Sequence, residues 1–221
     1  ATASVAELAI GHMIALSRHI ARADKTMKKG EWAKKKLKGN ELNEKTLGLI
    51  GTGNIGTYTA KLAQAFNMKV IGYDPFISKE DMKKEGIEKV EKLDEVMEKS
   101  DYISLHIPHN PKTHHIVNKE MMSKMKSSGY LINCARGGTV DEKALYDALK
   151  EGKIAGASLD VYENEPPKES PLFELENVVL TPHLGASTKE GQIRAGTVCA
   201  DQIIKVLNDE EPDFCVNKKF M

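Results

Sequence analysis

A glycine-rich segment, Gly51-Thr52-Gly53-Asn54-Ile55-Gly56, has the spacing that suits phosphate binding. The first glycine permits a tight turn, the second lets the backbone approach a pyrophosphate, and the third lets a helix pack closely on a strand. A strand-like run, 46–50, precedes the glycines and a helix-like run follows them. The N–H groups at the start of that helix would face the phosphates, so the segment predicts a dinucleotide site.

Asp74 follows the next apolar run, 69–73. Its carboxylate would accept hydrogen bonds from the adenosine ribose hydroxyls and would repel a 2′-phosphate, which favours NAD over NADP. A glycine-rich turn in an ordinary α/β protein is the alternative. The full order of strand, glycine turn, helix, strand and acid argues against it.

Two further side chains that suit catalysis follow strand-like runs. Arg136 precedes Gly137 and Gly138, and its guanidinium could hold a carboxylate through two parallel hydrogen bonds. A surface salt bridge is the alternative. His183 could accept a hydroxyl proton while a hydride leaves the same carbon, because imidazole carries protons near neutral pH. A structural histidine is the alternative there.

Three of the acidic residues between Arg136 and His183 are candidates for the site. A carboxylate bonded to His183 would orient the ring and favour its protonated form, and both Glu163 and Glu165 could supply it. The spacing does not choose between them. Asp160 ends its strand and could accept a hydrogen bond from the nicotinamide carboxamide, although an aspartate there could simply begin a turn.

Four histidines crowd one stretch: His106, His109, His114 and His115. No cysteine or carboxylate cluster accompanies them in the sequence, so we predict no metal site. His106 and Ile107 are expected to line the cofactor at a strand end. Cys134 should lie near the cofactor but lacks the pattern of a catalytic nucleophile.

The elements that must position these residues alternate along the chain. Strands are expected over 46–51, 69–73, 101–107, 129–134, 154–159 and 177–181, and helices over 55–67, 93–99, 118–125, 141–151 and 188–208. This alternation predicts an α/β fold, a doubly wound parallel sheet of the Rossmann type. Ligands bind outside the carboxyl ends of such strands. The positions that follow the expected strands are 51–56, Asp74, 106–108, 134–138, 160–167 and 182–185.

The first part of the chain predicts a helix and an arm. Ser4 and Glu7 have capping-box spacing, which favours a helix that starts near residue 5 and runs to about residue 23. Residues 30–43 are polar and hold the single tryptophan, Trp32. That side chain could pack on a partner subunit or on its own domain. A second capping box, Ser187 to Glu190, predicts the start of the last helix.

Composition excludes several classes of protein. The 221 residues include 32 basic and 32 acidic side chains, so no nucleic-acid or membrane partner is expected. Three cysteines, odd in number and far apart, fit a reducing cytoplasmic compartment. The sequence shows no pattern of a signal peptide and no apolar stretch long enough to span a bilayer.

Taken together, these motifs resemble the D-2-hydroxyacid dehydrogenase family over essentially the whole chain. The matching segments are 51–56, 133–142, 159–166 and 182–186. The resemblance implies that Arg136 binds the substrate carboxylate, that His183 is the acid/base, and that Glu165, directly before Pro166, is its partner. With the strand-end positions it gives the residues expected to bind NAD: Gly51, Gly53, Asn54, Ile55, Gly56, Asp74, His106, Ile107, Pro108, Cys134, Ala135, Arg136, Asp160, His183, Gly185 and Ala186.

Within the family, the segments 182–190, 133–138 and 4–8 look most like the branch that oxidises 3-phosphoglycerate for serine synthesis. Glyoxylate and hydroxypyruvate reductases, and corepressors that sense NAD, share much of the scaffold and are the alternatives. Family members have two domains, so the substrate domain is expected to be largely absent from this chain. The chain alone should then bind NAD but catalyse poorly.

The resemblance also divides the chain. Residues 1–44 are expected to form a connecting helix and a dimerisation arm, 45–208 the Rossmann-like core, and 209–221 a segment that returns toward the substrate domain. We therefore expect a homodimer that acts on a small 2-hydroxy acid.

Overall fold

The computed structural model describes residues 1–215, and its centre is one seven-stranded sheet in which every pairing is parallel. The spatial order is β3-β2-β1-β4-β5-β6-β7. The doubly wound fold is therefore confirmed. The strands are β1 (Thr46–Ile50), β2 (Lys69–Tyr73), β3 (Glu88–Lys89), β4 (Tyr102–Leu105), β5 (Tyr130–Asn133), β6 (Gly156–Leu159) and β7 (Val178–Leu180).

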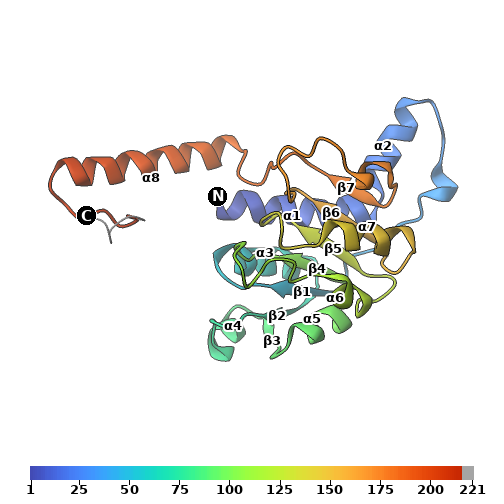
Figure 1. The fold of residues 1–221 in the computed structure, drawn as a ribbon, viewed down its shortest axis with the longest axis horizontal. Helices are drawn as coiled ribbons and strands as arrows, with labels where there is room; N and C mark the ends of the chain where they lie inside the picture. Colours follow the sequence, from blue (N-terminus) through green and yellow to red (C-terminus); the bar gives the residue numbers. More distant parts are fainter. Residues whose placement is uncertain (216–221) are drawn as a thin grey trace.

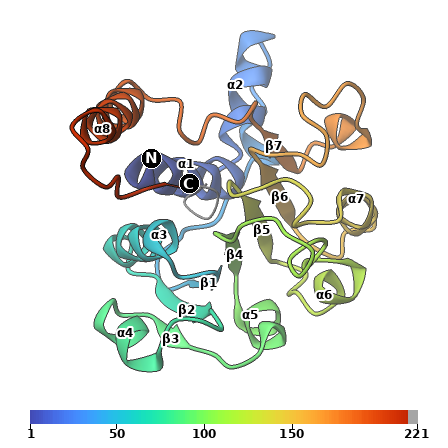
Figure 2. The same ribbon diagram turned by 60° about the vertical axis from the view of Figure 1, so that its left-hand side comes forward.

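Helices cover both faces of this sheet (Figure 2). One face carries α1 (Thr2–Ser17) and α3 (Asn54–Ala65), and the other carries α5 (Leu93–Lys99), α6 (Lys119–Ser123) and α7 (Glu142–Lys150). The inner strands β4, β5 and β6 are buried at every position, because parallel strands covered on both faces meet no water. Two apolar clusters form, one on each face.

Most expected elements lie within two residues of their predicted bounds, but the first helix does not. It ends at Ser17, and α2 (Ile20–Lys28) follows after a break in which His19 has φ of 53°. The Ser17 carbonyl accepts the Asn40 amide at 2.8 Å, so a segment distant in sequence caps the helix there. The predicted helix to residue 23 is therefore wrong.

The expected capping box at the first helix is also wrong. The helix already begins at Thr2, and the Ser4 hydroxyl instead pairs with Thr188 Oγ1 at 2.8 Å. Thr188 caps the last helix, α8 (Lys189–Leu207), by accepting the Gly191 amide at 2.9 Å. The short strand β3 and the short α-helix α4 (Lys79–Lys84) were not predicted.

Two segments project from the sheet layers. In Figure 1, α8 extends away from the sheet, and the arm after α2 loops out at the opposite side. The arm contains one 3-10 turn, η1 (Lys34–Lys36), and carries Trp32, which is 78% exposed and so does not pack on its own domain. A second 3-10 helix, η2 (Pro171–Glu174), precedes β7.

The predicted role of residues 1–44 in dimerisation stays a prediction, as does the path of 209–221, of which 216–221 lie outside the described residues. Among the helices of the described chain, none has the length and apolar character needed to cross a membrane.

Candidate active site

The predicted site residues share one edge of the sheet. All strands are parallel, so the segments that follow them leave at the same side. That edge therefore gathers the glycine loop after β1, Asp74 after β2, residues 106–108 after β4, 134–136 after β5, 160–165 after β6 and 183–186 after β7.

The glycine loop has one glycine that protein packing does not explain. A Cβ at Gly51, where φ is +92°, would lie 2.6 Å from the His106 carbonyl oxygen, and one at Gly56 would collide with the Gly51 carbonyl oxygen. Gly53 is exposed, and a Cβ there would meet nothing within 4 Å. Gly53 also precedes α3, whose first turn has no side-chain cap. Open space before free helix N–H groups fits a pyrophosphate.

Asp74 ties this loop to β2. One carboxylate oxygen accepts the Thr52 amide at 2.8 Å and the Thr52 hydroxyl at 3.3 Å, and the other accepts the Phe76 amide at 2.9 Å. The oxygen bonded to Phe76 keeps a second lone pair, so it can still accept from a ribose hydroxyl. Asp74 is only 8% exposed, and its bonds to Thr52 also hold the shape of the loop.

His106 packs against the glycine loop at Gly51. Its Nε2 lies 3.0 Å from Ser104 Oγ, and its buried Nδ1 has no hydrogen-bond partner among the described residues. A protonated ring would carry a hydrogen on that unpartnered nitrogen. Burial accordingly lowers the pKa of His106 to about 4, so the ring is neutral. Its contact with NAD stays a prediction.

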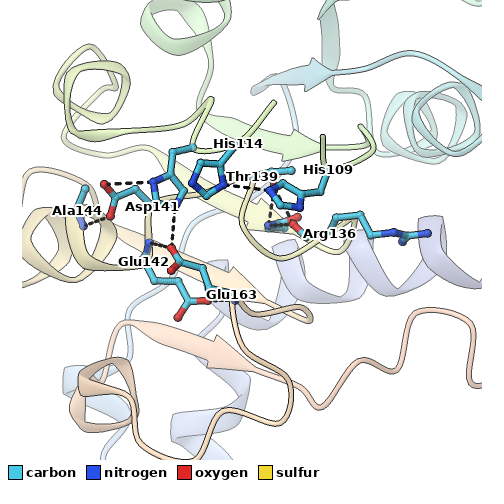
Figure 3. Close-up of polar contacts among 10 residues, drawn as sticks. His109, His114, Arg136, Thr139, Asp141, Glu142, Ala144 and Glu163 are labelled. Atoms are coloured by element: carbon cyan, nitrogen blue, oxygen red, sulfur yellow. Dashed lines mark hydrogen bonds and ion pairs between the residues drawn. The ribbon is translucent and has the colours of Figure 1, made fainter. Parts of the chain in front are cut away.

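Arg136 has a fixed backbone and an exposed side chain. Its carbonyl accepts hydrogen bonds from Thr139 Oγ1 at 2.7 Å and from Asn133 Nδ2 at 3.0 Å. The guanidinium donates through Nη1 to the neighbouring Ala135 carbonyl at 2.6 Å. Figure 3 shows it extending away from the polar cluster that includes Glu163. This geometry leaves most of the guanidinium open to receive a carboxylate.

His183 and Glu165 form the expected pair. Nδ1 of His183 lies 2.7 Å from a Glu165 carboxylate oxygen, and the other oxygen accepts the Tyr162 amide at 3.0 Å. Partial burial acts to raise the pKa of Glu165, but these two hydrogen bonds and the nearby positive charges outweigh it, and the pKa falls. The carboxylate is therefore ionised and orients the imidazole. The spacing left Glu163 open as a rival, but it contacts His115 instead.

Asp160 holds the segment that carries His183. Its buried carboxylate accepts the Leu184 amide at 2.7 Å, the Gly185 amide at 2.8 Å and the Thr181 hydroxyl at 2.5 Å. The backbone amide of His183, whose φ is 55°, donates to the Asp160 carbonyl at 2.8 Å. Asp160 is fully buried. Its contact with the nicotinamide stays a prediction, and what the structure shows is a positioning role.

Sequence reasoning missed His12, which lies beneath this segment. It is buried on α1, with Nδ1 2.6 Å from Ser158 Oγ and Nε2 3.2 Å from Thr181 Oγ1. The Thr181 hydroxyl donates to Asp160, so a hydrogen bond between Thr181 and His12 requires a proton on Nε2. Burial lowers the pKa of His12 against the opposing charge of Asp160. No sequence signal marks this residue, because its helix is apolar on most faces.

Cys134 also contacts His12, with its sulfur 3.5 Å from Nδ1. Burial, and to a lesser degree the charge of Asp160, raise the pKa of the Cys134 thiol, so it is no nucleophile near neutral pH. Gly185 is buried against Val5 and Asp160. Some exposure remains at the same edge for Ile107, Pro108, Ala135 and Ala186. Their contacts with NAD stay predictions.

One group in the described chain has atoms close enough to share a cation: His115, Asp141 and Glu163, whose ligand atoms lie within 4.8 Å of one another. These atoms already take part in contacts with one another or with the backbone. His115 Nε2 lies 2.9 Å from Glu163, its Nδ1 lies 4.0 Å from an Asp141 oxygen, and the other Asp141 oxygen caps α7 through the Ala144 amide. The histidine stretch itself holds no carboxylate, but the fold brings two carboxylates to His115. The predicted absence of a metal site stays a prediction.

Comparison with known families identifies the domain. Residues 10–185 match the model of the D-isomer specific 2-hydroxyacid dehydrogenase, NAD binding domain. The chain belongs to this family. NAD is therefore the cofactor of this domain. Its placement at the glycine loop stays a prediction, which agrees with the open space at Gly53.

Two curated family members show how much of a relative the chain represents. It is 53% identical over 214 residues to the D-3-phosphoglycerate dehydrogenase of Methanocaldococcus jannaschii, which covers 97% of the chain and 41% of that protein. It is 51% identical over 207 residues to the hydroxypyruvate reductase of Thermotoga maritima, covering 92% of the chain and 66% of that protein. The chain thus spans less than two thirds of either relative.

A solved structure from the same family has a closely similar fold. The D-lactate dehydrogenase from Aquifex aeolicus, complexed with NAD and lactic acid, superposes with a TM-score of 0.85 at 36% identity. The match covers 94% of the chain and 67% of that structure.

Proposed function

We propose that the protein uses NAD to oxidise a D-2-hydroxy acid, and that this acid is 3-phospho-D-glycerate, which becomes 3-phosphohydroxypyruvate for serine synthesis. The observation that carries the proposal is the 2.7 Å pair of His183 and Glu165, at the same edge of an NAD-binding domain as an exposed Arg136. The phosphoglycerate assignment is supported by the 53% identity to a D-3-phosphoglycerate dehydrogenase.

The chain's own residues divide the chemistry between them. Arg136 holds the substrate carboxylate and stabilises charge that develops on the C2 oxygen. His183, with Nδ1 held by Glu165, presents Nε2 to the C2 hydroxyl and accepts its proton. Glu165 stabilises the imidazolium that results. Bound NAD supplies the acceptor for the hydride that leaves C2.

The substrate is tested by assaying NADH formation by the full-length protein with 3-phospho-D-glycerate, D-glycerate and D-lactate in parallel, with glyoxylate and hydroxypyruvate in the reductive direction. We expect the highest kcat/KM with the phosphorylated acid. A preference for glyoxylate or hydroxypyruvate would keep the mechanism and move the protein to the reductase branch, to which the 51% identical relative belongs. No turnover of any of these acids would refute the enzymatic proposal.

We further propose a cytoplasmic homodimer in which the arm of residues 30–43 crosses to the partner. The 78% exposed Trp32 supports this, since an aromatic side chain that large is rarely left in water. Three cysteines, odd in number and far apart in the sequence, suit a reducing compartment. In sedimentation experiments we expect a dimer that Trp32→Ala weakens, and a monomeric wild type would contradict the arrangement.

A further inference from the structure

We propose that Glu163, held by His115, is a positioning residue that keeps the Arg136 loop in register with the Glu165–His183 pair. The inference rests on the proposed function, because it assigns Glu163 a part in that reaction without any contact with the substrate. It follows from three sets of contacts on the described residues.

The first set ties Glu163 to the start of α7. One carboxylate oxygen accepts His115 Nε2 at 2.9 Å and the Glu142 amide at 3.1 Å. The Glu163 amide donates back to the Glu142 carboxylate at 2.6 Å. Figure 3 shows Glu142 and Glu163 facing each other beside Asp141. This reciprocal pair fixes both the backbone and the side chain of Glu163.

The second set ties the same turn to the catalytic pair. The Tyr162 amide donates to Glu165, whose other oxygen holds His183. Glu163 and Glu165 therefore leave one short turn in different directions, one toward α7 and one toward the acid/base. A displacement of the turn at Glu163 would move Glu165 with it.

The third set ties the turn to the Arg136 loop. The backbone at Gly137 is pressed against Tyr162, so that a Cβ at Gly137 would collide with the Tyr162 carbonyl oxygen. His115 also contacts both loops: its amide donates to the Gly138 carbonyl at 2.8 Å, while its ring holds Glu163. One cluster of contacts around Glu163 therefore positions both Arg136, which would bind the substrate carboxylate, and His183, which would accept the proton.

The test compares variants of the full-length protein that remove or keep the bonding atoms. Glu163→Ala removes the acceptor, and Glu163→Gln keeps an oxygen that can accept both bonds. We expect Glu163→Ala to lower kcat/KM for the hydroxy acid roughly tenfold to hundredfold, since small misplacements of catalytic groups cost that much. Glu163→Gln should lose less than about threefold, because its amide oxygen rescues the geometry. NADH affinity should stay unchanged in both.

His115 supplies a second pair of variants in case Glu163→Ala fails to fold. His115→Leu should repeat the loss in kcat/KM, and His115→Gln, which keeps an N–H near Nε2, should recover most of it. Glu169→Ala changes an exposed acid on the same connection and is the matched control. If Glu163→Ala and His115→Leu both turn over at the wild-type rate, the inference is wrong.

Two other results have distinct meanings. A wild type that oxidises or reduces none of the acids would refute the proposed function. An active wild type whose Glu163→Ala and His115→Leu variants are equally active would refute only the positioning role. Activity lost on dialysis against EDTA and restored by Zn²⁺ would show that His115, Asp141 and Glu163 hold a metal, which would also overturn the inference.

Discussion

Acid should destabilise this domain through His106 by an amount that the structure sets. The pKa of the ring is about 4 in the fold, because the ring is buried and its Nδ1 has no partner among the described residues, against 6.5 when exposed. The unfolded chain therefore takes up the proton first. Stability from the neutral ring is complete above pH 6.5 and falls as the pH drops toward 4. The full loss is about 3 kcal/mol, of which about 2.5 kcal/mol is reached at pH 4.5.

Urea unfolding at pH 7 and at pH 4.5 measures this loss, with His106→Gln as the reference variant. Other titrating groups, such as His12, contribute equally to both proteins and cancel in the comparison. Wild type should lose about 2.5 kcal/mol more than His106→Gln between the two pH values. Equal losses, within about 0.5 kcal/mol, would show that burial does not hold this ring neutral.

Three further predictions concern the site. Gly53→Ala should leave the melting temperature unchanged and weaken NADH binding roughly tenfold or more in a fluorescence titration. Gly56→Ala should lower both the melting temperature and the NADH affinity, because only the Cβ at Gly56 meets protein. A folded Gly53→Ala that binds NADH normally would contradict the pyrophosphate placement. Glu165→Gln removes the carboxylate that stabilises the imidazolium of His183, so reductive turnover should fail at a lower pH in a pH–rate profile. An unchanged profile would show that the Glu165–His183 pair takes no part in the proton transfer. Asp160→Ala should lower kcat by roughly tenfold or more, because two backbone amides of the His183 segment lose their acceptor and the segment shifts, and retained kcat in a steady-state assay would argue against that role.

Local patterns predicted the parts of the fold that local forces determine. Five helices and six of the strands follow the alternation of apolar runs, and α5 has its predicted bounds. The break at His19 could not be predicted in this way, because the amide that caps Ser17 belongs to Asn40, far along the chain. Ser4 likewise matched a capping pattern, yet its partner Thr188 comes from the far end of the sequence.

The same distinction between local patterns and distant contacts applies to the site residues. Side chains that follow strands, such as Arg136 and His183, could be predicted to share one edge, because a parallel sheet collects its strand ends there. The choice between two glutamates depended on how one turn folds, which spacing does not encode. His12 could not be found, since a polar residue on an apolar helix gains meaning only from the buried partners Ser158 and Thr181.

The central claim is that His183 carries the proton and adds little to the affinity for NAD, which the other predicted cofactor residues supply. It is tested most directly by measuring turnover and NADH affinity of His183→Ala on one preparation of the full-length protein. We expect kcat to fall by roughly a hundredfold or more, with the NADH dissociation constant within about threefold of wild type. Retained turnover, or a parallel loss of NADH binding, would contradict the assignment of His183 as the acid/base.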